Sequence, residues 1–163
     1  MTGYAVLVGA HIVVGTAGLL LGPVVGWADT RRHTWARTLG YWYLGITAAV
    51  CITATWMVLV RRTDLWWLIP VSALTFALAV LGRYALFRPE AWTHAYVHGL
   101  GGSYIALITA TVVVSFALDG PLYGASELIA WLGPTAIGAP LLELWRKTLI
   151  PRLHDTPPVH LQT

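Results

Sequence analysis

The stretch THAYVHGLGGSYIALITATVVV, Thr93 to Val114, decides how the chain folds. From Val97 onward the chain has no charged side chain for about twenty residues, the length that a helix needs to cross the hydrocarbon core of a bilayer. Two histidines, His94 and His98, stand four residues apart at its beginning. The stretch therefore predicts a transmembrane helix that carries a candidate ligand pair near one end.

The composition of the whole chain agrees with lipid as its surroundings. Charged residues make up 10% of the 163 residues, hydrophobic residues make up 57%, and the mean hydropathy is +0.68. Soluble domains contain about 25% charged residues, so this chain has too few to cover a surface that faces water. Its ten Lys and Arg residues stand between the apolar segments, as they do in the loops of a membrane protein. They do not form one basic patch, so the sequence predicts no nucleic-acid partner. Cys51 is the single cysteine, so no disulfide forms within one chain.

Five apolar segments predict an all-α, polytopic transmembrane bundle in which residues 1–150 form one domain. The expected spans are about Tyr4–Ala28, Leu39–Val60, Leu65–Leu81, Val97–Leu118 and Leu122–Leu144. The first segment is expected to be a mature span rather than a signal peptide, because it lacks a basic start and is too long. Pro134 and Pro140 are expected to kink or break the fifth span. Residues 151–163, which contain prolines, are expected to form a flexible cytoplasmic tail.

The distribution of positive charge predicts the direction of the chain. Eight Lys and Arg residues fall on one side of this threading, and two, Arg61 and Arg62, fall on the other. Basic loops are retained on the cytoplasmic side. We therefore expect the N-terminus outside and the C-terminus in the cytoplasm.

Small residues at helical spacing predict where the helices pack closely. In the first span these residues are Gly15, Gly18, Gly22 and Gly26. His11 precedes Gly15 by four residues and is expected on the same face. In the fourth span His94 and His98 share a face with Gly102, so the pair is expected on the packed side of the helix rather than toward lipid.

The pair His94 and His98 is the first candidate site. Residues four apart on a helix lie about 6 Å from each other, which suits two ligands of one metal ion. Ala95 stands where the HExxH motif of a zinc protease has glutamate, so a metalloprotease of this type is excluded. His33, in the basic first loop on the same side, is the candidate third ligand. The alternative is that these interfacial histidines bind lipid phosphate, water or backbone carbonyls.

His11 is a different kind of candidate, because it lies inside an apolar run. An ionisable residue within the membrane predicts a functional site; the alternative is a neutral imidazole hydrogen-bonded to a neighbouring helix. Haem b held between His11 and His98 would need both at one depth. They enter from opposite surfaces, and counting 1.5 Å per residue leaves a gap on the order of 10 Å. We therefore expect His11 to form a separate or second site. Covalent haem is excluded because the CxxCH motif is absent.

Three further charged residues are candidates. Arg83 and Arg88 flank the connection between the third and fourth spans and are expected near His94. They would bind an anion such as a lipid headgroup, a carboxylate or a diphosphate, or they serve only as positive anchors. Glu127, near the start of the fifth span, either complements the helix dipole or accepts a proton on the outer side.

Three segments resemble an uncharacterised bacterial family of small predicted membrane proteins. They are HIVVGTAGLLLGP (His11–Pro23), ARTLGYWYL (Ala36–Leu44) and HAYVHGLGGSYIALITATVVV (His94–Val114). This chain has Ala36 where the family has histidine. The resemblance implies a shared fold, shared polar positions and a bacterial plasma membrane, but no particular reaction. At the level of fold, the intramembrane histidines are also similar to those of four-helix haem-b electron carriers.

Three functions follow from these patterns. The first is a metal- or haem-dependent redox protein that acts on quinone or another lipophilic partner, with His94 and His98 as ligands and His11 or His33 completing the set. The second is a membrane-embedded acid/base enzyme for an isoprenoid or lipid substrate, in which the histidines and Glu127 move protons. The third is a non-catalytic subunit of a larger membrane complex or a homo-oligomer.

Overall fold

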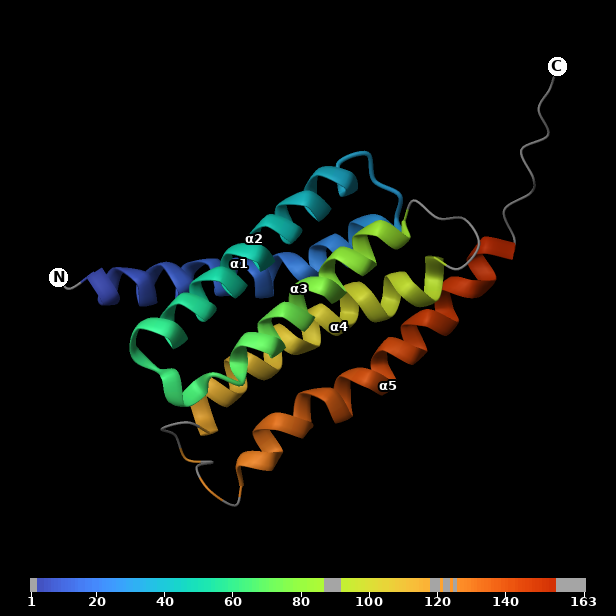
Figure 1. Ribbon diagram of the computed structural model, residues 1–163. Helices are drawn as coiled ribbons and strands as arrows, with labels where there is room; N and C mark the ends of the chain where they lie inside the picture. Colours follow the sequence, from blue (N-terminus) through green and yellow to red (C-terminus); the bar gives the residue numbers. More distant parts are fainter. Residues whose placement is uncertain (1–2, 87–91, 118–120, 122–123, 125, 155–163) are drawn as a thin grey trace.

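The computed structural model describes residues 3–86, 92–117, 121, 124 and 126–154 of the chain. Five helices in this part are long and apolar enough to cross a membrane, which confirms an all-α bundle of about five spans (Figure 1). The helices are α1 (Gly3–Thr30), α2 (Ala36–Arg61), α3 (Leu68–Ala85), α4 (Trp92–Val112) and α5 (Glu127–His154). A short 3-10 turn, Thr63–Leu65, precedes α3, and a π-helical turn, Val113–Ala117, follows α4.

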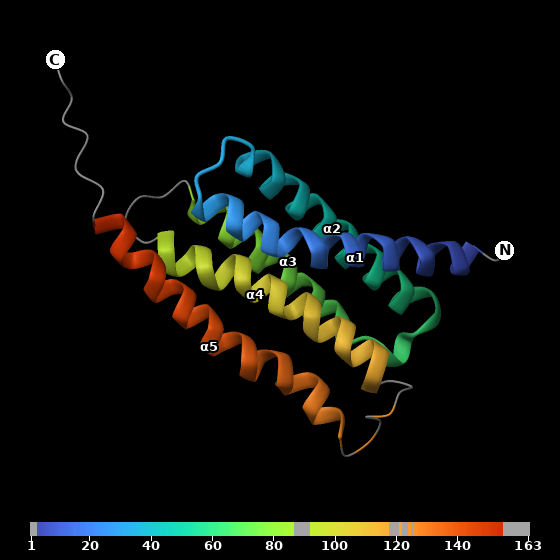
Figure 2. The same cartoon turned by 180° about the vertical axis from the view of Figure 1, so that it is seen from behind.

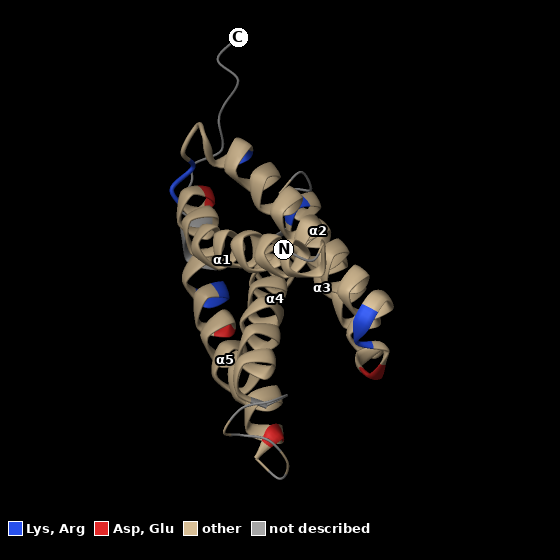
Figure 3. Cartoon of the chain, turned by 90° about the vertical axis from the view of Figure 1, so that its left-hand side faces the viewer, with Lys and Arg blue, Asp and Glu red and all other residues tan. Residues whose placement is uncertain are grey.

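The helices pack mainly against their neighbours along the chain. α3 and α4 form the centre of the bundle, α2 packs on α3, and α5 packs on the other side of α4 (Figures 1 and 2). α1 packs on α2 and also contacts α4, while its N-terminal end extends beyond the other helices. We call the end of the bundle where α1, α3 and α5 finish the basic end, because it carries Arg31, Arg32, Arg37 and Arg83. Arg61 and Arg62 lie at the opposite end. Most of the ribbon carries no charged residue (Figure 3).

The helix boundaries differ most from the expected spans in α4 and α5. α4 begins at Trp92, five residues before the expected Val97, so His94 and His98 both lie within the helix. α5 begins at Glu127 and continues to His154. The helix is continuous through Pro134 and Pro140, so a break there is wrong, whereas a kink stays a prediction. The physical reason is that lipid offers no hydrogen-bond partners, so the backbone groups other than those lost at the prolines are still satisfied best within a helix.

The glycine face of α1 is confirmed over only part of its length. Gly18, Gly22 and Gly26 are buried, and their neighbours include side chains of α2, α4 and α5. At Gly22 a β-carbon would lie within 2.8 Å of the ring of Tyr104. Gly15 was expected on the same packed face, but no atom of another helix lies within 4 Å of its β-carbon position. N-terminal to Gly18, α1 instead contacts α2, through His11 and Tyr4.

A local ion pair holds the turn between α2 and α3. Arg62 Nη2 lies 3.2 Å from Asp64 Oδ2, and Arg62 Nε donates to both carboxylate oxygens. The guanidinium of Arg62 holds the pKa of Asp64 below its usual value. Because both groups are exposed, this pair orders the turn but contributes little to stability.

Candidate functional site

A buried polar cluster lies where α1, α2, α3 and α4 meet at the basic end. Arg83 Nη1 lies 3.5 Å from Asp29 Oδ1, and Arg83 Nη2 donates to the carbonyl oxygen of Arg37 at 2.9 Å. Tyr96 donates its hydroxyl proton to Asp29 Oδ2 at 3.0 Å. The side chains of Arg83 and Asp29 are only 9% and 7% exposed. Each charge is therefore compensated inside the bundle rather than by water.

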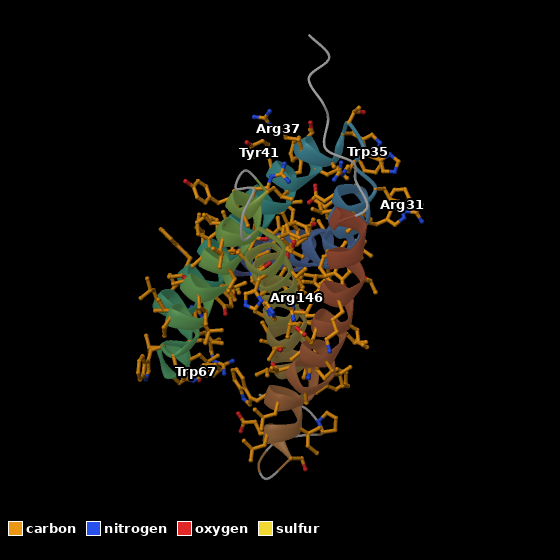
Figure 4. All side chains as sticks on the ribbon, turned by 90° about the vertical axis from the view of Figure 1, so that its right-hand side faces the viewer. Arg31, Trp35, Arg37, Tyr41, Trp67 and Arg146 are labelled. Atoms are coloured by element: carbon orange, nitrogen blue, oxygen red, sulfur yellow. The ribbon has the colours of Figure 1, made fainter. Side chains whose placement is uncertain are left out.

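The surroundings of Arg83 are shaped around its guanidinium group. Gly40 provides the space, because a β-carbon there would overlap the guanidinium. The ring of Tyr41 lies 5.1 Å from Arg83 Cζ and 6.0 Å from Arg37 Cζ. A small cavity of about 10 Å³ adjoins the ion pair and is lined in part by Tyr43 and Tyr96. Figure 4 shows Arg37 and Tyr41 together at this end of the bundle, far from Trp67.

The expected anion site at Arg83 and Arg88 is only partly described. Arg83 faces Asp29, so its nearest anion is the protein's own carboxylate. Arg88 lies outside the described residues.

Asp29 itself was not identified from the sequence, although a signal was present. It is the one acidic residue in the first apolar run, and a carboxylate in the last turn of a helix opposes the helix dipole. Such a residue requires a cationic partner.

The histidine pair lies on α4 beside this cluster. The rings of His94 and His98 are close, with centroids 4.3 Å apart and planes at 53°. His94 is exposed and His98 is half-buried. The prediction that the pair lies on the packed face is therefore wrong for His94. Tyr96, Val97 and other residues on a different side of the helix form that face. The side chains of α4 are apolar or small on all sides of the helix, so the sequence did not show which side is packed.

Charged residues of α5 stand next to His98. Arg146 binds Glu143 through two hydrogen bonds of 2.7 and 2.8 Å, and Lys147 Nζ lies 4.0 Å from Glu143 Oε1. Glu143 and Arg146 are both close enough to interact electrostatically with His98. Figure 4 shows Arg146 away from Arg31 and Arg37. The side of α4 and α5 that carries the histidines is therefore polar and partly exposed.

His33 does not join the pair. Its ring stacks on that of Trp35, with centroids 4.9 Å apart, and also contacts the tilted ring of Trp27 at 4.8 Å. Within the described part of the chain, no group of three or more His, Cys, Asp or Glu side chains is placed to hold a metal ion. The three-ligand set of His33, His94 and His98 is thus not assembled in this structure.

His11 is hydrogen-bonded to α2 and lies far from His98. Its Nδ1 is 2.8 Å from Thr53 Oγ1. The contacts of Gly18 with Leu107 and of Gly26 with Leu100 set an antiparallel register between α1 and α4. This register places His11 about 17 residues from the level of His98, or about 25 Å at 1.5 Å per residue. One haem cannot contact both histidines, and the separation exceeds the gap expected from the sequence.

Glu127 also lies far from the histidine pair. It begins α5 and accepts a hydrogen bond from Trp131 Nε1, 3.3 Å away on the same helix. The contact of Gly138 with Ile105 sets the register of α5 on α4. By that register, Glu127 is about 18 residues, or about 27 Å at 1.5 Å per residue, along the bundle from His98. The two residues cannot act on one substrate atom as an acid/base pair.

No protein-family model, curated protein or solved structure matches the chain. The resemblance to an uncharacterised bacterial family stays a prediction. The function is therefore argued from the geometry of these sites.

Proposed function

We propose that this integral membrane protein binds one transition-metal ion through His94 and His98 and uses it on a lipophilic partner in the adjoining leaflet. The observation that carries the proposal is the closeness of the two imidazoles, whose centroids are 4.3 Å apart on one side of α4. Imidazole suits zinc, copper, iron and nickel. With metal–nitrogen bonds of about 2 Å, two ligand nitrogens lie about 3 Å apart, and a small rotation of each ring would provide that spacing.

The exposure of the pair supports a reactive rather than a structural metal. A structural zinc ion has four protein ligands, whereas a catalytic ion keeps positions open for water or substrate. Two histidines would leave such positions open. His94 is exposed at the level of the helix ends, where the polar headgroup of a lipophilic molecule lies. This arrangement favours a metal-dependent reaction over the acid/base mechanism that needs Glu127.

Metal titration tests the proposal directly. In lipid nanodiscs at about pH 7.5, the full chain is expected to bind one Co²⁺ ion. His94→Ala and His98→Ala should each weaken binding by at least about tenfold, which is about 1.4 kcal/mol, because each removes a ligand. The measurement is the cobalt absorption spectrum together with calorimetry. His33→Ala is the matched control and should bind cobalt like the parent protein. Unchanged binding in both pair variants would reject the site.

Binding is also expected to weaken as the pH falls. A histidine ligand binds metal as the neutral imidazole, so protons compete with the metal. An ordinary imidazole titrates near about pH 6.5, and affinity should fall most steeply below that value. The same cobalt titration at about pH 7.5 and about pH 5.5 measures the effect. Equal affinity at both values would indicate ligands other than histidine.

A further inference from the structure

We infer that His11 forms a second, separate site, which binds the hydroxyl group of a lipophilic molecule such as a hydroquinone in the opposite half of the membrane from His98. This inference goes beyond the metal site and does not depend on it. It follows from the hydrogen bonds of Thr53, from the open surroundings of His11 and from the chemistry of lipid.

The hydrogen bonds of Thr53 assign the tautomer of His11. Thr53 Oγ1 lies 2.7 Å from the oxygen of Ala49 and 3.0 Å from that of Val50, so we assign its single hydroxyl proton to a bond with its own helix. Its oxygen therefore acts as the acceptor in the 2.8 Å contact with His11 Nδ1. A neutral imidazole carries one ring proton. With that proton on Nδ1, Nε2 presents a lone pair.

The space around His11 allows a ligand to reach Nε2. The described residues supply no hydrogen bond to this atom, and it is not among the buried side-chain nitrogen and oxygen atoms that lack a partner, so it is not fully enclosed. The imidazole is half-buried, and its neighbours Ile12 and Val13 are exposed. One turn along α1, Gly15 has nothing within 4 Å of its β-carbon position. A flat molecule can therefore approach the side of α1 next to the imidazole.

The chemistry of Nε2 selects the class of ligand. A polar atom that faces hydrocarbon is costly unless it gains a hydrogen bond, and lipid tails have no donors. An unprotonated Nε2 accepts hydrogen bonds and cannot donate one. It would bind the hydroxyl of a hydroquinone, a phenol or another lipophilic alcohol. It would not bind the carbonyl of a quinone, which is also an acceptor.

The experiment compares three probes on the full chain in nanodiscs under anaerobic conditions: a short-chain ubiquinol, its quinone and its dimethyl ether. Binding is measured by quenching of tryptophan fluorescence. The quinol is expected to bind at least about tenfold more tightly than either other probe. His11→Phe, which keeps a flat ring but lacks the acceptor, should remove this preference. Equal affinities for quinol and ether in the parent protein would overturn the inference, as would an unchanged preference in His11→Phe.

A second pair of variants tests the orientation of the ring without removing it. Thr53→Val removes the acceptor for Nδ1 and should reduce the preference for the quinol, whereas Thr53→Ser should keep it. Thr109→Val is the matched control, because Thr109 makes the same bond to its own helix on α4 and should have no effect. If Thr53→Val and Thr53→Ser behave alike, Thr53 does not position His11 and the inference fails. His94→Ala should keep the preference, which separates this result from that of the metal site.

Discussion

Replacing Gly99 with alanine is expected to force α3 and α4 apart. A β-carbon at Gly99 would overlap the backbone nitrogen of Gly82 and lie 2.6 Å from its Cα. The same is true in reverse, because a β-carbon at Gly82 would overlap the backbone of Leu100. Backbone atoms cannot rotate away as side chains do. Either substitution must therefore separate the two central helices, with an expected loss of about 3 kcal/mol of unfolding free energy.

Reversible unfolding in mixed micelles, followed by tryptophan fluorescence, measures this loss. Gly45→Ala is the matched control, since Gly45 lies on an exposed side of α2 with nothing within 4 Å. Alanine favours a helix over glycine by up to about 1 kcal/mol, so this variant should be at least as stable as the parent. Equal stability of Gly99→Ala and Gly45→Ala would show that the two backbones are not in contact at this crossing.

The second large effect is expected from Asp29→Ala. The substitution leaves Arg83 buried without its carboxylate and removes the acceptor of the Tyr96 hydroxyl. Removing one partner of a buried ion pair costs about 3–5 kcal/mol, because the remaining charge stays uncompensated. The free energy of unfolding should therefore fall by this amount. Asp64→Asn breaks an exposed pair and should change stability little, which makes it the control for loss of an acidic charge.

A double variant separates the effect of a buried charge from the loss of packing. Asp29→Leu combined with Arg83→Met removes both charges and keeps apolar volume. It is expected to be more stable than either single variant, because apolar pairs replace buried ion pairs without a large loss. If the single-variant losses simply add in the double variant, Asp29 and Arg83 are not coupled and the ion pair does not organise this junction.

The candidate sites show which contacts can be read along one helix. His94 and His98 were recognised because both lie on α4, where helical spacing alone brings them together. The pairing of Asp29 with Arg83 joins residues 54 positions apart, and that of Tyr96 with Asp29 joins residues 67 apart. No local pattern encodes these contacts. His33 was the expected third ligand because it lies on the same side of the membrane as the pair, but its ring stacks on Trp35 and contacts Trp27 instead.

The sequence by itself determined that the chain forms five apolar helices, because each run is long enough to cross a bilayer and the chain has too little charge for a surface in water. It also determined that His94 and His98 are neighbours, because the helix repeat fixes their spacing. Only the tertiary structure decided which side of α4 is packed, that Asp29 compensates Arg83, and that His11 and His98 lie about 25 Å apart. The physical reason is that these features depend on the register between helices. Close backbone contacts such as that of Gly82 with Gly99 set this register, and uniformly apolar faces do not.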